Sequence, residues 1–546
     1  CEFSWLYRQF KGFPMCGPDF SDEDVHENIA TVVQGIEQFV AAGQNPEASA
    51  LMEQLIPVIA HGIDFAEQAG EVGLFSGLAL ACARLSRLED AKNYAGRAII
   101  ENPDDLLAHA LLAPEARISI ARALIHHQRH DLARDLLKTL GMTGQSSEGE
   151  FYLELLDFYD TQKALARNLT PSLVGGDSRP TLISLVIWGE ALIEKCLAFD
   201  LSSLLAPGNI PAMASEGGVI LDVFTAEADQ ELLLNHAVFK TVARFADVRV
   251  TCIPDTLLEH PKNESTPDPD RWCVAGAQYC SAIAARQLDA DLVFVGAGNI
   301  YSECYLSGVK QHIENGIGCV VTAAIRAEED TMVENLALFR EAGSNHIEID
   351  SGDLLAYSVE NMSKQFFDSF IQSNPTTVGH DPVAVFFRTD EGFCSHTFQL
   401  NPAMISSDLL PDDFVFDFHT ADARFMAEIV DGRDAEALIK VIEEPIGDIA
   451  VLKLEPAGSG KSYGEFPVTP GECAKAGLKL CDQETDITYF LWAFRQRFSV
   501  DCGDQVVTLP ESDLSEEQTV EEIMELFEAG IQDTVNRIRF YSGAYR

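Results

Sequence analysis

The sequence predicts an α/β protein with an N-terminal all-α solenoid, in which helical hairpins are followed by a doubly wound, mainly parallel sheet. Two observations predict this fold class. From about residue 22 to 167, apolar residues recur at three- and four-residue spacing, which is typical of helices. Beyond residue 180, short continuous apolar runs alternate with helical stretches, a pattern typical of parallel strands covered by helices on both faces. With 546 residues, the chain is long enough for several domains.

One stretch of the helical part resembles a tetratricopeptide repeat. Large residues, small residues and a closing proline follow the spacing of that repeat at Phe75, Leu78, Ala79, Cys82, Ala91, Ala95, Ala98 and Pro103. Small residues at Ala48, Ala91 and Ala133 recur about 43 residues apart, against about 34 in the standard repeat. We expect about three hairpins in a repeat domain over residues 1–175. Such a domain could bind a protein partner on its concave face, support its neighbour, or form a homo-oligomer.

A loop at 175–180 separates this domain from the predicted α/β domain, residues 180–460. Five apolar runs are predicted to form its first strands: Leu182–Trp188, Val219–Thr225, Val248–Ile253, Asp291–Val295 and Gly318–Ala324. Further strands are expected at Ala384–Phe387, Val415–Phe418 and Ile449–Leu454. Residues 461–546 form an acidic, mainly helical C-terminal region, with amphipathic helix expected over Glu516–Phe540.

Charge and composition exclude several classes of protein. Against 38 basic residues stand 86 acidic ones, a net charge of −48 that would repel nucleic acid. No apolar run is long enough for a membrane span. Thirteen cysteines are scattered without a Cys-x-x-Cys pair, which predicts a cytoplasmic protein and no zinc or redox motif.

Polar and aromatic residues follow the predicted strands at Trp188-Gly189-Glu190 and at Thr225 with Asp229. With the helix leading into Asp291–Val295, these features resemble GT-A glycosyltransferases. The whole chain resembles bacterial proteins that join helical repeats to such a domain. The resemblance implies a nucleotide-sugar donor at the carboxyl ends of the strands, with Trp188 stacked on the base and Glu190 or Asp229 bonded to ribose or uracil. The alternative is that Trp188 is a core residue and that Glu190 and Asp229 cap helices.

The resemblance also implies an Asp-x-Asp pair after Val295, where a divalent cation would meet the diphosphate. The sequence instead has Gly296-Ala297-Gly298-Asn299. Magnesium and manganese prefer carboxylate oxygens, so we expect no metal at this site. Gly296, Gly298 and Asn299 would line a donor site that works without metal or has lost catalysis.

The best candidates for a base on the acceptor side are His396, Asp417 and His419, with Asp422 nearby. If Val415–Phe418 is a strand that continues to His419, Asp417 and His419 lie on one face of it. Solvent-facing polar residues on a half-buried strand are the alternative.

Two classes of function therefore remain open. The first is a glycosyltransferase-like protein that transfers a sugar from a nucleotide-sugar donor without the usual metal. The second is a non-catalytic interaction or assembly protein that uses a transferase-like scaffold and helical repeats to bind partners. The missing Asp-x-Asp favours the second class, and Glu190 and Asp229 favour the first.

Overall fold

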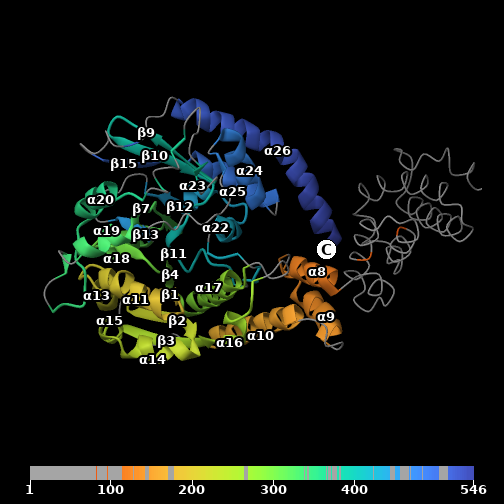
Figure 1. Cartoon of the computed structure of the whole chain (residues 1–546), viewed down its shortest axis with the longest axis horizontal. Coiled ribbons are helices and arrows are strands. Elements are labelled where there is room, and N and C mark those ends of the chain that lie inside the picture. Colours follow the sequence, from red (N-terminus) through yellow and green to blue (C-terminus); the bar gives the residue numbers. More distant parts are fainter. Residues whose placement is uncertain are drawn as a thin grey trace, which may run out of the picture. The chain divides into compact units, whose positions relative to one another are not determined.

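The computed structural model describes most of the chain from residue 114 onward (Figure 1). The described residues are 82, 95, 114–126, 128–141, 147–169, 178–262, 268–336, 339–340, 343–363, 366, 370–371, 378–379, 383–412, 414–417, 419–421, 423–442, 449–455, 466–467, 469–481, 484–502, 509 and 514–545.

The chain divides into two compact units, which we describe separately. The first comprises Cys1–Leu156, Pro261–Pro267 and Asn536–Arg546, and the second comprises Asp157–His260 and Asp268–Val535.

In the first unit, α8 (Pro114–His126) and α9 (His130–Gly141) pack together as a helical hairpin. Gln128 makes the turn with a φ of 60°, and its N–H donates to the carbonyl of Ile125 at 2.8 Å. This bond satisfies a carbonyl at the end of α8 that has no partner within the helix. The repeat-like stretch lies outside the described residues, apart from Cys82 and Ala95, which are helical and buried.

A seven-stranded, mostly parallel sheet forms the centre of the second unit. Its order is β12-β6-β11-β4-β1-β2-β3, and only β11 runs antiparallel to its neighbours. The strands are β1 (Thr181–Val186), β2 (Val219–Ala226), β3 (Ala246–Ile253), β4 (Asp291–Val295), β6 (Cys319–Val321), β11 (Pro402–Ile405) and β12 (Ile439–Val441). The predicted mainly parallel sheet is confirmed, with β4 as a central strand.

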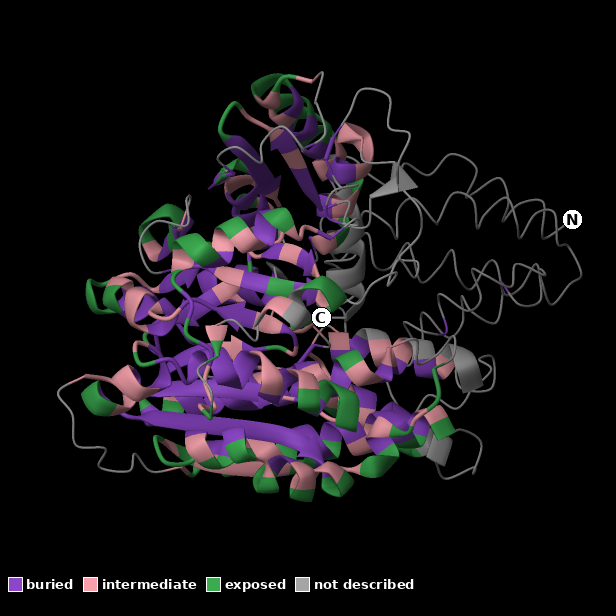
Figure 2. Cartoon of the chain, turned by 60° about the vertical axis from the view of Figure 1, so that its left-hand side comes forward, coloured by how far each residue is buried: buried purple, intermediate pink, exposed green. Residues whose placement is uncertain are grey.

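Helices cover both faces of this sheet. On one face, apolar residues of β1, β2 and β4 share a core with α11 (Glu190–Ala198), α12 (Asp200–Leu204), α13 (Ile210–Glu216), α15 (Ala237–Val242) and α18 (Tyr305–Glu314). On the other face lie α17 (Pro269–Leu288) and α22 (Ala423–Val430), where the Phe425 ring meets Phe294 of β4 edge-on at 5.6 Å. Figure 2 shows the central strands as a buried layer, while many helices expose their outer faces.

Three smaller sheets extend the unit. The first consists of β15 (Phe498–Asp501), β10 (Gly392–Thr397) and β9 (Ala384–Arg388). The second consists of β5 (Asn299–Tyr301), β13 (Val451–Glu455) and β7 (Ile325–Glu328). The third is the pair β14 (Phe466–Pro467) and β8 (Val378–Gly379). Gly392 is required where β10 meets β15, because a Cβ there would lie 1.9 Å from the carbonyl oxygen of Val500.

The remaining described helices are α10 (Ser147–Arg167), the 3-10 helix η1 (Glu227–Asp229), α14 (Gln230–Asn235), α16 (Asp255–Leu258), α19 (Glu329–Leu336), α20 (Ser351–Glu360), α23 (Ala435–Leu438), α24 (Pro470–Leu480), α25 (Glu484–Arg495) and α26 (Glu516–Tyr545). None of the helices in the described part of the chain is both long and apolar enough to cross a bilayer.

The predicted strand at Val415–Phe418 is wrong for its described residues, because residues 414–417 pair with no strand. Side chains satisfy this backbone instead. The hydroxyl of Tyr159 donates to the carbonyl of Phe414 at 2.9 Å, and the N–H of Phe416 donates to that hydroxyl at 3.2 Å. The N–H of His419 donates to Asp417 Oδ1 at 3.1 Å, a local turn that competes with strand pairing.

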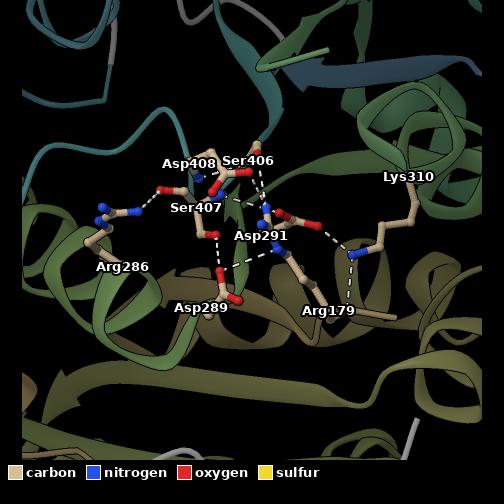
Figure 3. A network of polar contacts seen from close by, with 8 residues as sticks. All are labelled: Arg179, Arg286, Asp289, Asp291, Lys310, Ser406, Ser407 and Asp408. Carbon is tan, nitrogen blue, oxygen red and sulfur yellow. Dashed lines mark hydrogen bonds and ion pairs between the residues drawn. The ribbon is translucent and has the colours of Figure 1, made fainter. Parts of the chain in front are cut away.

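A polar network closes the amino edge of the sheet, where the parallel strands begin (Figure 3). Asp291, the first residue of β4, is 1% exposed and forms an ion pair with Lys310 of α18. Its Oδ1 also accepts a bond from the N–H of Ser407 at 3.3 Å. Burial raises the pKa of the Asp291 carboxyl, although Lys310 opposes that shift. The eight residues drawn are Arg179, Arg286, Asp289, Asp291, Lys310, Ser406, Ser407 and Asp408.

Candidate functional site

The order of the strands places a topological switch point between β1 and β4. Along the chain, the sheet grows from β1 through β2 to β3 on one side, and then continues with β4 on the other side of β1. Ligands of open α/β sheets bind at such a point, beyond the carboxyl ends of the strands. Trp188 and Glu190 follow β1 here, the first half-buried and the second exposed, and Gly296–Asn299 follow β4.

We call residues Gly296–Asn299 the strand-end loop. Its backbone is held by a carboxylate from another element, Asp200 at the start of α12. Asp200 Oδ2 accepts from the N–H of Gly298 at 2.7 Å, and Oδ1 accepts from the N–H of Asn299 at 2.9 Å. Asp200 is fully buried, and burial raises its pKa well above the ordinary value, although these two N–H groups oppose the shift. The carboxylate therefore orders the loop and is not exposed to bind a cation.

A second carboxylate holds the backbone after β1. Asp229, in η1, accepts a bond from the N–H of Gly189 at 2.6 Å, directly before α11. Gly189 has a φ of 83°, a conformation that favours glycine at this turn. Thr225 lies within β2 with its side chain fully buried, so it does not face the strand end as a ligand contact would.

One basic residue, Lys195, lies against the strand-end loop. Lys195 of α11 pairs with Glu329 at 2.6 Å and also approaches the carbonyl of Leu454 at 3.4 Å. A Cβ on Gly298 would lie 2.5 Å from Lys195 Cε, so the lysine packs directly against the loop. Arg326 of β7 pairs with Glu455 at 3.1 Å in the small sheet that begins at the loop. The loop thus has a lysine beside it, paired with Glu329, and no acid within it.

A hydrophobic pocket lies at the same edge of the sheet, beyond β6 and β12. It is lined by Thr322, Ala323, Ile325, Leu355, Ile442, Ile449, Ala450, Val451, Phe498, Ser499 and Val500. Its lining is mostly apolar, so it suits a hydrophobic group better than a charged one.

Asp417 and His419 belong to a polar cluster with Tyr279, Arg424 and Glu428, in which His419 and Glu428 are half-buried. Asp417 is 1% exposed, and its Oδ2 lies 3.2 Å from Arg424 Nε. The Tyr279 oxygen lies 3.0 Å from Asp417 Oδ1 and 2.9 Å from Glu428 Oε2. Arg424 Nη1 lies 2.9 Å from His419 Nε2, so one arginine joins the two predicted residues. Burial, and then these two carboxylates, raise the pKa of Tyr279 well above its ordinary value.

His396 lies in another cluster. It is on β10, where its ring contacts Glu516 of α26 and the carbonyl of Phe494. No contact in the described residues joins it to Asp417 or His419. The structure therefore brings together two of the three predicted acceptor-side residues, through Arg424, and Asp422 lies outside the described residues.

The sequence interpretation missed Asp200 and Lys195. Both lie in the helical stretch after β1, where a charged residue is expected to face solvent. The break between α11 and α12 at Phe199, with a φ of −118°, turns Asp200 toward the loop. No local pattern in the sequence predicts this break.

Models of known protein families and a search of curated proteins find no match to this chain.

Proposed function

We propose that the second unit is a glycosyltransferase-like domain that binds a nucleotide sugar between the carboxyl ends of β1 and β4 without a divalent cation. One observation carries the proposal: Lys195 packs against an acid-free strand-end loop at the switch point of the sheet. The mostly parallel sheet supports it, as does the resemblance of the strand ends to GT-A transferases.

The diphosphate is the part of the donor that most needs a partner. The chain carries a net charge of −48, so an anion requires a local cation at its site. Lys195 supplies that charge where the resemblance implies a metal. In the complex, the diphosphate replaces Glu329 as the partner of Lys195. The ammonium group then stabilises the charge that develops on the leaving diphosphate.

The other residues position the donor. Trp188, half-buried after β1, stacks on the base, and the exposed carboxylate of Glu190 accepts a hydrogen bond from the ribose. Asp229 and Asp200 do not contact the donor in this proposal. They hold the backbone of Gly189, Gly298 and Asn299 in the geometry that the donor meets. The hydrophobic pocket beyond β6 and β12 would receive an apolar part of the acceptor.

Calorimetric titration of uridine and guanosine diphosphate sugars tests the proposal, first with chelator and then with manganese. We expect affinity for one donor that is independent of metal. Lys195→Met should weaken it about tenfold to a hundredfold, because a hydrogen bond to a charged group contributes about 1.5–3 kcal/mol. Lys475→Met is the matched control, since Lys475 pairs with Glu472 on α24 and is 67% exposed. Metal-dependent binding, or equal affinity in both variants, would contradict the proposal.

The alternative is an assembly protein that keeps the fold and has lost the chemistry. One observation favours it: the N–H groups of Gly189, Gly298 and Asn299 already bond to carboxylates of the chain itself. These groups are therefore not free to bind a phosphate, as backbone N–H groups do in many nucleotide sites. If no nucleotide sugar binds the wild-type protein, this alternative becomes the better account.

A further inference from the structure

Three side chains with metal-binding atoms converge between β10 and the first turn of α26. Cys394 and His396 are two residues apart on β10, so their side chains project from the same face of that strand. Glu516 is the first residue of α26. Their sulfur, nitrogen and oxygen atoms all lie within 4.8 Å of one another, the one such group of three found in the described residues. Cys394 is fully buried and His396 is 5% exposed.

The hydrogen bonds of His396 provide a second, independent observation. Its Nδ1 lies 3.1 Å from the carbonyl oxygen of Phe494, which can only accept, so Nδ1 carries a hydrogen. A neutral imidazole then has a bare lone pair on Nε2. That atom lies 3.1 Å from Glu516 Oε1, which is also an acceptor. Two acceptors at this distance are stable only if a cation lies between them, either a proton or a metal ion.

The surroundings suit a metal ion. Histidine ligands commonly donate their second N–H to a carbonyl, and ligating carboxylates are themselves hydrogen-bonded. Here Phe494 orients His396, and Arg497 Nε donates to Glu516 Oε1 at 2.7 Å. Zinc ligands at about 2.0–2.2 Å in tetrahedral geometry place nitrogen and oxygen about 3.3 Å apart. The observed 3.1 Å between His396 Nε2 and Glu516 Oε1 is close to this value.

We propose that Cys394, His396 and Glu516 bind a divalent metal ion of the zinc class. Thiolate, imidazole and carboxylate are the ligands that zinc takes in proteins, and three protein ligands leave the fourth position to water. The site joins the start of α26 to β10, two elements that are 120 residues apart along the chain. It is separate from the switch point of the central sheet and does not depend on the function proposed there.

The charges in the cluster show what the metal must displace. Burial, and then Glu516, raise the pKa of the Cys394 thiol to about 12, so without metal the sulfur is protonated. Burial opposes ionisation of Glu516, but bonds from Arg497, Cys394 and His396 lower its pKa to about 2. Glu516 is therefore already a carboxylate. Metal binding therefore releases the thiol proton of Cys394.

Cobalt(II) provides the direct test, because it reports its ligands by absorption. The full chain is treated with chelator, freed of it, and titrated with cobalt(II) and then with zinc. We expect one ion per chain, a near-ultraviolet band from sulfur-to-cobalt charge transfer, and loss of that band when zinc displaces cobalt. Proton release on zinc binding, measured by calorimetry in buffers of different ionisation enthalpy, should accompany it.

Variants assign the ligands. Cys394→Ser should abolish the sulfur band, and His396→Ala and Glu516→Gln should each weaken binding at least tenfold. The matched control is Cys319→Ser, which changes another fully buried cysteine, on β6, and should keep the band. A wild-type protein without the band, or a Cys394→Ser variant that retains it, would overturn the proposal. The wild-type spectrum decides the question even if a variant fails to fold.

Discussion

At the amino edge of the central sheet, Asp289 and Asp291 bond mainly to other side chains, whereas at the carboxyl edge Asp200 and Asp229 bond to backbone N–H groups. Asp291 pairs with Lys310, and Asp289 with Arg179 and Ser407 (Figure 3). At the opposite edge, Asp200 accepts from two backbone N–H groups of the strand-end loop.

The difference separates two uses of a buried carboxylate. An ion pair between side chains joins elements, because each partner comes from a different helix, strand or loop. A carboxylate on backbone N–H groups instead fixes the shape of a loop. A fixed loop shape matters most where a ligand approaches the backbone. In a parallel sheet, ligands approach at the carboxyl edge. The amino edge should therefore contribute more to stability, and the carboxyl edge more to binding.

The largest effect should follow from removing the cation at the amino edge. Lys310→Met leaves Asp291 buried without its ion-pair partner, and breaking a buried pair in this way costs about 3–5 kcal/mol. Chemical denaturation followed by circular dichroism measures the loss. Asp291→Asn combined with Lys310→Met should recover part of it, because no unpaired charge then remains.

Asp412→Ala is the control for this prediction. Asp412 bonds to Arg286 at 2.8 Å near the same edge, but it is 86% exposed. An exposed pair contributes less than about 1 kcal/mol. If Lys310→Met costs no more than this control, the amino edge does not stabilise the fold as we infer.

An intermediate effect should follow from Asp200→Asn at the carboxyl edge. The amide keeps one acceptor oxygen, and its NH₂ group faces the other backbone N–H, so one donor loses its partner at a cost of about 1–3 kcal/mol. Asp229→Asn is the matched control. Asp229 accepts from one N–H only, and the amide oxygen can replace it, so the loss should stay below about 1 kcal/mol.

The effect of pH sharpens this prediction. Burial raises the pKa of Asp200 well above its ordinary value. The native state therefore binds the proton of this carboxyl group more tightly than the unfolded chain does. Its contribution to stability is complete below the ordinary pKa of about 3.9 and is lost as pH rises through the raised value. The difference in unfolding free energy between wild type and Asp200→Asn should therefore narrow as pH rises from about 4 through the raised pKa of Asp200. A gap that widens over this range would contradict the assignment.

Much of the sheet could be predicted from the sequence, because its long strands are buried on both faces. β4 has the predicted bounds, and β1, β2 and β3 lie within two residues of theirs. β11 and β12 were missed because strands of four and three residues, the first beginning with Pro402, carry too little pattern. The strand predicted at Val415–Phe418 failed because Tyr159 and Asp417 satisfy backbone groups that strand pairing would need.

The candidate sites depend more on tertiary structure. Trp188, Glu190 and the strand-end loop could be predicted because parallel strands end at a common edge. Asp200 could not, because a turn of the backbone at Phe199 directs it, and Lys195 could not, because only the packing of α11 brings it against Gly298. The third ligand of the metal site is equally remote: Cys394 and His396 are two residues apart, but Glu516 follows 120 residues later. The absence of Cys-x-x-Cys excluded only local zinc motifs.

The smallest effect tests how tightly the carboxyl edge is packed. Gly298 has a φ of 91° and Gly316 a φ of 93°, so alanine at either position meets the same backbone strain, about 1 kcal/mol. A Cβ at Gly316 has no atom within 4 Å, whereas one at Gly298 lies 2.5 Å from Lys195 Cε.

Gly316→Ala should therefore report strain alone, and Gly298→Ala should lose about 1 kcal/mol more by displacing Lys195 from Glu329. Chemical denaturation measures both losses, and a double-mutant cycle with Lys195→Ala isolates the displacement, because the extra loss should vanish once the lysine is short. If the two glycine variants lose the same stability, Lys195 adapts to the new methyl group. The carboxyl edge would then be looser than the amino edge, and Lys195 would have freedom to move toward a ligand without help from the loop.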